Sequence, residues 1–263
     1  MARRFSNLIF TLFLSLMFIF SNACSQTNTE EQARMRREIE ELKAGQREIQ
    51  EQLRELKGEP IPKSISPAKL QTPFDLPLDG ASPEVKGSSS ARLAIVEFSD
   101  FQCSYCLSYV TETFPQIDKA YIKTGKLKYF FRNLPLTNGH PNAFRAAEAA
   151  RCAAEQGKFW EAHDRFFANQ DTLNPNDWPQ HAEALRLDTA KFDECLLKGK
   201  YDAEINKDVE EAARLGLNGT PAFLIGVLAP DGQHLSVHKV MLGAEPFESF
   251  KQALDEALSS KGK

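Results

Sequence analysis

The sequence has no excess of positive charge, few cysteines and no long uninterrupted hydrophobic segment. Its 263 residues carry 32 Lys and Arg against 36 Asp and Glu, a formal net charge of −4 at pH 7. A nucleic-acid-binding domain usually carries a strong excess of positive charge, so nucleic acid is not an expected partner. Five cysteines are too few for a disulfide-rich scaffold, whereas 42% hydrophobic residues, including 19 Phe, suffice for a folded core and exclude a wholly disordered chain.

The N-terminus predicts export. Arg3 and Arg4 precede an apolar run from Leu8 to Phe20, which is interrupted only by a Thr and a Ser. A run of about 13 residues is short for crossing a bilayer but matches the core of a secretory signal peptide. We therefore expect residues 1–23 to be a signal peptide, with a retained membrane anchor as the alternative.

Cys24 is a candidate for lipidation. It directly follows Ala23, and this arrangement resembles the lipobox of bacterial lipoproteins, whose cysteine carries the lipid. The lipobox prefers Leu three residues before the cysteine, where this chain has Ser21. Ordinary cleavage and lipidation with a membrane tether at Cys24 therefore both remain open. Setting Cys24 aside leaves four cysteines, an even number that suits an oxidising compartment.

Residues 24–57 contain a short heptad pattern. Thr29 and Gln32 fit a capping box, and Gln46 fills the one position that breaks the apolar 4-3 spacing. The apolar positions are Met35, Ile39, Leu42, Ile49, Leu53 and Leu56. Gly45 and the narrow apolar stripe would leave an isolated helix marginal in water. We predict that this stalk associates with copies of itself as a coiled-coil dimer or trimer; the alternatives are a solvated spacer helix and a helix packed on its own domain.

Residues 58–86 are rich in proline, and Gly and Ser follow towards residue 90. Such a composition predicts a linker or arm that is extended and semi-rigid where proline dominates and flexible where Gly and Ser take over. The globular domain is therefore expected to span residues 87–260.

Within that domain, predicted strands and helices alternate. Residues 93–98 and 126–132 are expected to be strands, joined by a helix over residues 103–124, and this βαβ unit predicts that the two strands are parallel. A helical insertion follows at about residues 139–200. The remaining elements are expected to be a helix over 203–215, strands over 222–227 and 235–241, and a helix over 246–258. The predicted fold class is α/β with a helical insertion.

A Cys-x-x-Cys motif follows the first predicted strand. Cys103 should open the helix, where free backbone N–H groups and the helix dipole lower the pKa of a thiol and make it the reactive sulfur. Cys106 lies one turn further on the same face, close enough to resolve a mixed disulfide by bonding to Cys103. This pattern predicts a thiol-disulfide exchange site.

A Cys-x-x-Cys pair is also half of a zinc site, which needs two further ligands. The only suitably spaced pair is His234 and His238, which lies far downstream on a predicted strand. We therefore predict no metal site and interpret both histidines as exposed strand residues. The other histidines, His140, His163 and His181, are interpreted as ordinary helix or loop residues.

Taken together, these motifs resemble the DsbA-like branch of the thioredoxin superfamily, which comprises bacterial extracytoplasmic thiol-disulfide oxidoreductases. The resemblance is carried by residues 96–106, 131–136, 156–160 and 219–223, and it spans most of residues 93 to 258. It implies a thioredoxin fold with a helical insertion, preceded here by the coiled-coil-like helix and the Pro-rich linker. The redox-active disulfide between Cys103 and Cys106 would be the only redox group, without a further cofactor.

The resemblance also implies roles for residues outside the Cys-x-x-Cys motif. Pro221 matches the family's cis-proline, which would bring the backbone of Thr220 beside the cysteines, where a substrate strand can pair with it. Glu97 occupies the strand position of a buried acid beneath the second cysteine. Burial should raise the pKa of Glu97, which could accept the proton of Cys106 directly or through water. An edge-exposed Glu97 is the alternative.

In related sequences, Cys152 and Cys195 look like a pair that staples the insertion, and two buried free thiols are the alternative reading. Ser104 and Tyr105, between the reactive cysteines, are expected to contact substrate. They lack the His that helps to make the most oxidising relatives. The sequence therefore leaves open whether the protein is an oxidase, an isomerase or a reductase.

The implied protein is an exported enzyme, periplasmic or membrane-anchored on the extracytoplasmic side. It would act on exported proteins with thiols or disulfides, together with a membrane redox partner. A homo-oligomer formed through the stalk would favour isomerase or reductase work, by analogy with stalked relatives. The alternative is a membrane-tethered chaperone or assembly factor on a thioredoxin scaffold. A peroxide- or metal-handling lipoprotein is not favoured, because this chain lacks a peroxidatic sequence pattern and has no soft-ligand cluster beyond the one cysteine pair.

Overall fold

The computed structural model describes residues 73–78 and 84–259. The chain divides into two units, residues 1–63 and 64–263, and all the described residues belong to the second. The predicted signal peptide, Cys24, the stalk and most of the linker lie outside the described residues. No helix in the described part is long and apolar enough to span a membrane.

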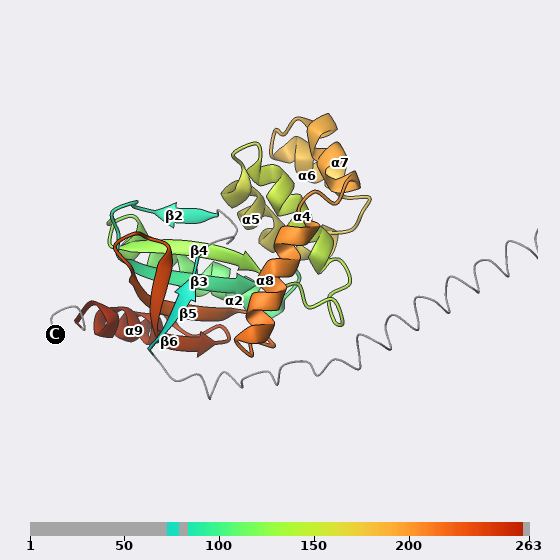
Figure 1. Cartoon of the computed structure of the whole chain (residues 1–263). Coiled ribbons are helices and arrows are strands. Elements are labelled where there is room, and N and C mark those ends of the chain that lie inside the picture. The colour runs from blue at the N-terminus through green and yellow to red at the C-terminus, as the bar shows by residue number, and fades with distance from the viewer. Residues whose placement is uncertain (1–72, 79–83, 260–263) are drawn as a thin grey trace, which may run out of the picture. The chain divides into compact units, whose positions relative to one another are not determined.

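A six-stranded mixed sheet forms the centre of the domain (Figure 1). The strands are β1 (Phe74–Pro77), β2 (Val85–Gly87), β3 (Leu93–Ser99), β4 (Leu127–Asn133), β5 (Ala222–Leu228) and β6 (His234–Leu242). Their spatial order is β1-β6-β5-β3-β4-β2. The parallel pairing of β3 with β4 confirms the predicted βαβ unit, and the other neighbouring strands are antiparallel.

Strand β3 is buried along its whole length because layers cover both faces of the sheet. Leu93 and Ile95 pack on one face, whereas Val96 and Phe98 pack on the other. This alternation follows the two-residue period of a strand. The continuous apolar sequence of β3 therefore reflects its central place in the sheet.

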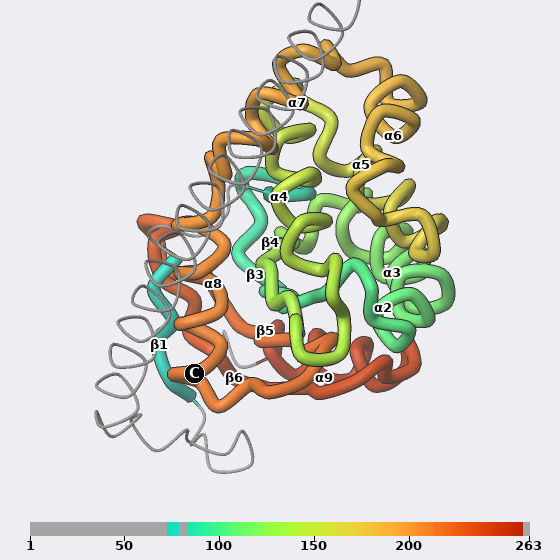
Figure 2. Tube along the Cα trace, turned by 90° about the vertical axis from the view of Figure 1, so that its right-hand side faces the viewer, coloured from blue at the N-terminus to red at the C-terminus, as the bar shows by residue number. Residues whose placement is uncertain are grey.

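Helices cover both faces of the sheet and form a separate insertion (Figures 1 and 2). On one face lie α2 (Ser104–Ser108), η2 (Tyr109–Thr113), α3 (Phe114–Ile117), η3 (Asp118–Ile122) and α9 (Phe247–Ser259). On the other face lies α8 (Asp202–Arg214). The predicted helix over residues 103–124 is thus a helical run from Ser104 to Ile122 in which η2 and η3 are wider π-helical turns. Pro115 lies in the first turn of α3 and has no N–H for the preceding turn, which accounts for the wider turn at η2.

The insertion has a core of its own. Its helices are α4 (Ala143–Ala154), α5 (Phe159–Ala168), η4 (Gln170–Thr172), α6 (Trp178–Ala184) and α7 (Thr189–Leu197). A disulfide joins Cys152 of α4 to Cys195 of α7, with 5.9 Å between their Cα atoms. The structure thus contains the pairing that the family resemblance implied, and the reading of two free thiols does not apply.

The proline-rich segment, predicted to be a linker or arm, contributes edge strands to the sheet in its described parts. β1 pairs with β6 at one edge and β2 pairs with β4 at the other. Edge strands tolerate proline because one side of the strand makes no ladder hydrogen bonds. Leu76 of β1 is buried in the core, and Glu84 pairs with the buried Arg151. The folded domain therefore begins before residue 87, the boundary expected from composition.

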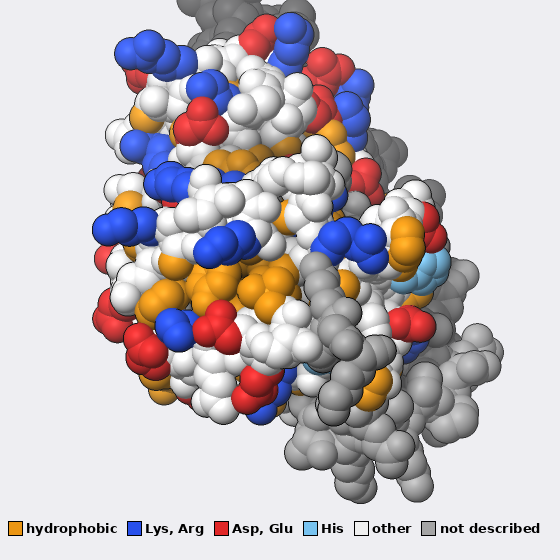
Figure 3. Space-filling model, turned by 90° about the vertical axis from the view of Figure 1, so that its left-hand side faces the viewer, with side chains coloured by type: hydrophobic (Ala, Val, Ile, Leu, Met, Phe, Trp, Pro, Cys, Tyr) orange, Lys and Arg blue, Asp and Glu red, His pale blue; other side chains and the backbone are white. Residues whose placement is uncertain are grey.

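The charges on the domain surface are mixed in sign. Figure 3 shows Lys and Arg side chains interspersed with Asp and Glu around a patch of apolar side chains. The face in this view therefore presents no positively charged stripe of the kind that tracks a nucleic-acid backbone.

Candidate active site

The two cysteines of the Cys-x-x-Cys motif lie where the sheet meets the helical layer. β3 ends at Ser99, and Cys103 takes the N-cap position of α2 with an extended backbone (φ −76°, ψ 124°). Cys106 lies one turn into the helix and is completely buried, whereas Cys103 retains 5% exposure. Both are free thiols in this structure. The short turn between β3 and α2 therefore places Cys103 at the N-terminus of α2.

The two thiols have opposite electrostatic environments. A hydrogen bond from the Cys106 thiol, assisted by Thr220 and by backbone N–H groups of the first helical turn, lowers the pKa of Cys103 to about 5. Burial raises the pKa of Cys106 well above its ordinary value, and the neighbouring Cys103 and Glu97 raise it further. At neutral pH, Cys103 is consequently a thiolate and Cys106 keeps its proton.

The loop before β5 lies against the reactive sulfur. The Thr220–Pro221 peptide bond is cis, and the Sγ atom of Cys103 lies 3.4 Å from the carbonyl oxygen of Thr220. The backbone N–H of Gly243 donates a 2.8 Å hydrogen bond to the carbonyl oxygen of Pro221, which ties this loop to the end of β6. The two residues inferred from the family pattern thus lie beside Cys103.

Glu97 is buried on β3, with 1% exposure, so the edge-exposed alternative does not apply. The Tyr129 hydroxyl donates a 2.6 Å hydrogen bond to Oε2 of Glu97, and the hydroxyls of Tyr109 and Tyr129 are 2.9 Å apart. Burial raises the pKa of Glu97, and the charge of His163 opposes this rise. The negative charge of Glu97 in turn contributes to the raised pKa of Cys106.

Sequence reasoning missed the partners of Glu97. The parallel register places Ile95 opposite Tyr129, so the Tyr129 side chain shares a sheet face with Glu97. His163 was interpreted as an ordinary residue, yet it is 1% exposed and packs among aromatic rings of the insertion core. Only the strand register and the docking of the insertion bring these side chains together, so no local pattern could identify them.

The insertion also holds the loop that precedes the reactive cysteine. The side-chain amide of Gln170, in η4, donates hydrogen bonds of 2.8 Å to the carbonyl oxygen of Phe101 and 3.0 Å to that of Cys103. Gln102 accepts a 2.7 Å hydrogen bond from the backbone N–H of Asn142. The insertion is therefore a support for the Cys-x-x-Cys loop.

Asp100 provides a second attachment for this loop. Its buried carboxylate accepts hydrogen bonds from the backbone N–H groups of Gln102, at 2.7 Å, and Leu136, at 2.8 Å. It also lies 2.7 Å from Nδ1 of His140. His140, interpreted from sequence as an ordinary residue, thus contacts the loop between β3 and Cys103.

The sheet topology separates the cysteines from His234, one of the two histidines that a zinc site would need. Leu228 pairs with Leu235, and Val227 pairs with Leu93, so His234 lies near the start of β3, whereas Cys103 follows its end. Over residues 73–78 and 84–259, no three His, Cys, Asp or Glu side chains form a group that could hold a metal ion.

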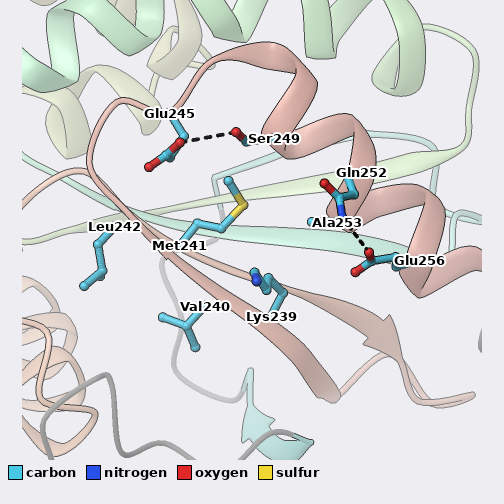
Figure 4. A pocket seen from close by; sticks show the side chains of 9 residues that line it. All are labelled: Lys239, Val240, Met241, Leu242, Glu245, Ser249, Gln252, Ala253 and Glu256. Carbon is cyan, nitrogen blue, oxygen red and sulfur yellow. Dashed lines mark hydrogen bonds between the residues drawn. The ribbon is translucent and has the colours of Figure 1, made fainter.

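A groove opens near the cis-proline loop. It has a volume of about 340 Å³ and lies between the end of β6 and α9, as Figure 4 shows. Leu242 at its rim is 48% exposed and pairs with Ala222, the residue after Pro221. Tyr105, between the two cysteines, is 67% exposed. Ser104 is also exposed. The surface around Cys103 therefore carries exposed large hydrophobic side chains.

Comparison with known proteins matches the chain to the family model described as Thioredoxin, over residues 81–234. Among curated proteins, it is 39% identical over 150 residues to the Na(+)/H(+) antiporter NhaA 3 of Salinispora tropica. That match covers 57% of this chain but only 22% of the antiporter. The chain thus spans about a fifth of the length of this relative, whose transport activity is not carried over to it.

Solved structures share the fold at low sequence identity. The oxidised BdbD of Bacillus subtilis matches with a TM-score of 0.61 and 20% identity, over 72% of this chain and 98% of that one. The alpha-DsbA1 protein of Wolbachia pipientis matches with a TM-score of 0.57 and 22% identity, over 68% and 93% of the two chains. These similarities establish a DsbA-like thioredoxin fold.

Proposed function

The chain belongs to the thioredoxin family, and we propose that it is an exported thiol-disulfide oxidoreductase that exchanges disulfides with proteins through Cys103 and Cys106. The observation that carries this proposal is the opposite tuning of the two thiols. The pKa of Cys103 is lowered to about 5 at the helix N-terminus, whereas burial raises the pKa of Cys106. Such a pair combines a reactive sulfur with a protected resolving sulfur.

The exchange follows from this geometry. In the oxidising direction, a substrate thiolate attacks Sγ of Cys103, the Cys103–Cys106 bond breaks, and the departing Cys106 sulfur takes a proton. A second substrate thiolate then attacks the substrate sulfur of the mixed disulfide and releases Cys103 as a thiolate. The low pKa of Cys103 makes it a good leaving group in this last step. In the reverse direction, Cys103 attacks a substrate disulfide and Cys106 resolves the mixed disulfide.

The surface around Cys103 supports the proposal that the substrates are proteins. The backbone of Thr220 lies beside the reactive sulfur, where an extended substrate segment can pair with it. Tyr105, between the two cysteines, and Leu242, opposite the residue after Pro221, expose large hydrophobic side chains. Side chains of this type suit the apolar segments of an unfolded client protein. Ser104 is proposed to contact the client as well.

The remaining parts of the proposal concern the residues before the domain. We propose export through residues 1–23, a membrane tether at Cys24 and self-association through residues 24–57, all of which rest on the sequence pattern. An oligomer of facing sites would favour isomerase or reductase work on misfolded clients, with a membrane protein as redox partner.

A refolding assay tests the proposed function. A test protein with scrambled disulfides is incubated with the mature protein, with a version that lacks residues 24–57, or with the Cys103→Ala variant. Recovery that needs both Cys103 and the stalk supports an oligomeric isomerase. Oxidation of a reduced test protein that needs Cys103 but not the stalk supports a tethered oxidase. Recovery that persists in Cys103→Ala contradicts the oxidoreductase and favours the alternative of a chaperone or assembly factor.

A further inference from the structure

The resolving step of the proposed function poses a problem of proton transfer. Cys106 attacks only as a thiolate, yet it is completely buried. Glu97 is the buried acid that influences this thiol, but one of its two carboxylate oxygens is engaged by Tyr129. If the proposed function holds, the proton of Cys106 has to reach the other oxygen, Oε1.

The side chain of Ser99 is within hydrogen-bonding reach of both Glu97 and Cys106. Ser99 is the last residue of β3, two residues after Glu97, so the two side chains project from the same face of the sheet. This is the face of Leu93 and Ile95, which pack in the core shared with the active-site helices. Ser99 and Glu97 are each 1% exposed, so bulk water does not separate them from Cys106.

Two polar atoms on this face lack a well-formed hydrogen bond. Oε1 of Glu97 and Oγ of Ser99 are both buried and make no hydrogen bond of good geometry in the resting site, although the Ser99 side chain is close enough to act as a hydrogen-bond donor to both Glu97 and Cys106. A buried polar atom without a partner costs free energy, so such atoms are uncommon in folded proteins. Glu97 and Ser99 occupy neighbouring positions on the same face of β3. Their two oxygen atoms can therefore form a transient hydrogen bond with each other during a reaction.

The hydroxyl of Ser99 stabilises the anion on either side of it. As a hydrogen-bond donor it opposes the rise that burial causes in the pKa of Glu97 and in the pKa of Cys106. A serine hydroxyl is both a donor and an acceptor and rotates about its Cα–Cβ bond. Ser99 can therefore accept a proton from one neighbour while it donates its own to the other.

We propose that the hydroxyl of Ser99 carries the proton of Cys106 to Glu97 when the mixed disulfide is resolved. The S–H bond of Cys106 breaks and its proton passes to Oγ of Ser99, while the hydroxyl proton of Ser99 passes to Oε1 of Glu97. The Cys106 thiolate then attacks Sγ of Cys103 and expels the substrate thiolate. Ser99 ends unchanged, and Glu97 ends protonated.

The other titratable groups around Glu97 do not replace this path. Tyr129 and Tyr109 come from β4 and η2, and burial raises the pKa of both hydroxyls well above the ordinary value. Both hydroxyls therefore remain protonated; Tyr129 donates to Oε2 of Glu97, and Tyr109 contacts the hydroxyl of Tyr129. His163, from α5, stabilises the carboxylate through its charge. Cys103 is engaged in the mixed disulfide during this step.

A reaction with two kinetic phases separates attack by Cys103 from resolution by Cys106. Reduced protein is mixed with dithionitrobenzoate, whose released thiolate absorbs visible light. The first phase reports attack by Cys103, and the second reports resolution by Cys106. In Ser99→Ala, we expect the rate of the second phase to fall at least about tenfold at neutral pH. This is less than the full rate enhancement that general acid–base catalysis usually gives, about 100-fold or more. The first phase and the thiolate titration of Cys103 should not change.

Matched variants separate a relay from a structural role. Ser99→Thr keeps the hydroxyl, so its second phase should be as fast as that of the unmodified protein. Ser99→Gly removes the hydroxyl and leaves a smaller side chain than Ser99→Ala, yet it should slow the second phase to the same extent. Thr113→Val removes another buried hydroxyl, which donates to the carbonyl oxygen of Glu245, and should leave both phases unchanged. Ser99→Ala should add nothing further in a Glu97→Gln background, because both changes interrupt one path.

The proposal is overturned if the second phase of both Ser99→Ala and Ser99→Gly matches that of the unmodified protein across the pH range. It is also overturned if Ser99→Thr is as slow as Ser99→Ala. Failure of the proposed function looks different, because the unmodified protein would then lack a fast first phase that depends on Cys103.

Discussion

The reactivity of Cys103 depends on its neighbour Cys106, and this dependence can be measured. The largest contribution that lowers the pKa of Cys103, from 9.0 to about 5, is the hydrogen bond from the Cys106 thiol. We expect the ultraviolet absorbance of the thiolate in the reduced protein to appear with a midpoint near pH 5. Cys106→Ala removes the donor and should raise this midpoint, whereas Cys106→Ser keeps a donor and should raise it less.

The same shift predicts how stability depends on pH. A change from 9.0 to about 5 corresponds to about 5 kcal/mol, since one pKa unit is about 1.4 kcal/mol. Because the pKa is lower in the folded state, the contribution is fully present above the unfolded value near pH 9 and is lost as the pH falls towards 5. At pH 7, about half of it remains, roughly 3 kcal/mol.

Urea unfolding of the reduced and the oxidised protein measures this contribution, because the oxidised form has no thiol at Cys103 to ionise. The stability of the reduced form relative to the oxidised form should rise between about pH 5 and pH 9. A thiolate midpoint that stays near 9 would refute the reasoning. So would an identical midpoint in the Cys106→Ala variant, since the hydrogen bond would then have no effect.

Three further predictions concern the support of the site. Gln170→Ala removes two hydrogen bonds to the reactive loop, so we expect a loss of about 1 to 3 kcal/mol in urea unfolding and a higher thiolate midpoint. Gln156→Ala also removes two side-chain-to-backbone bonds in the insertion and should leave the midpoint unchanged; equal midpoints in the two variants would contradict a positioning role. Replacing both Cys152 and Cys195 by Ala opens a loop with a sequence separation of 43 residues and should lower stability by about 4 kcal/mol in the same assay. A version that begins after β2 uncovers both sheet edges, so light scattering should detect aggregation, and a stable monomer would show that the edge strands are dispensable.

The reactive centre was accessible from sequence because its signals are local. A buried apolar strand, a cysteine at the start of the next helix and a second cysteine one turn later predict the arrangement of Cys103 and Cys106 without knowledge of the rest of the chain. The Gly-Thr-Pro motif located Pro221 through the family resemblance. Hydrophobic periodicity likewise predicted the parallel β3–β4 pair and the helical insertion, because each depends on neighbouring residues.

The partners of the centre were not accessible in this way. Tyr129 reaches Glu97 through the register of β3 and β4, and Gln170 reaches the carbonyl oxygens before Cys103 because the insertion folds back on the loop. The proline-rich segment was predicted to be a linker or arm, because its composition does not indicate that β1 and β2 pair with the edges of the sheet. Sequence alone therefore identified the two cysteines of the proposed reactive site and the elements that carry them. Tertiary structure decided which side chains set their protonation and which strands close the sheet, because contacts between distant residues have no local signature.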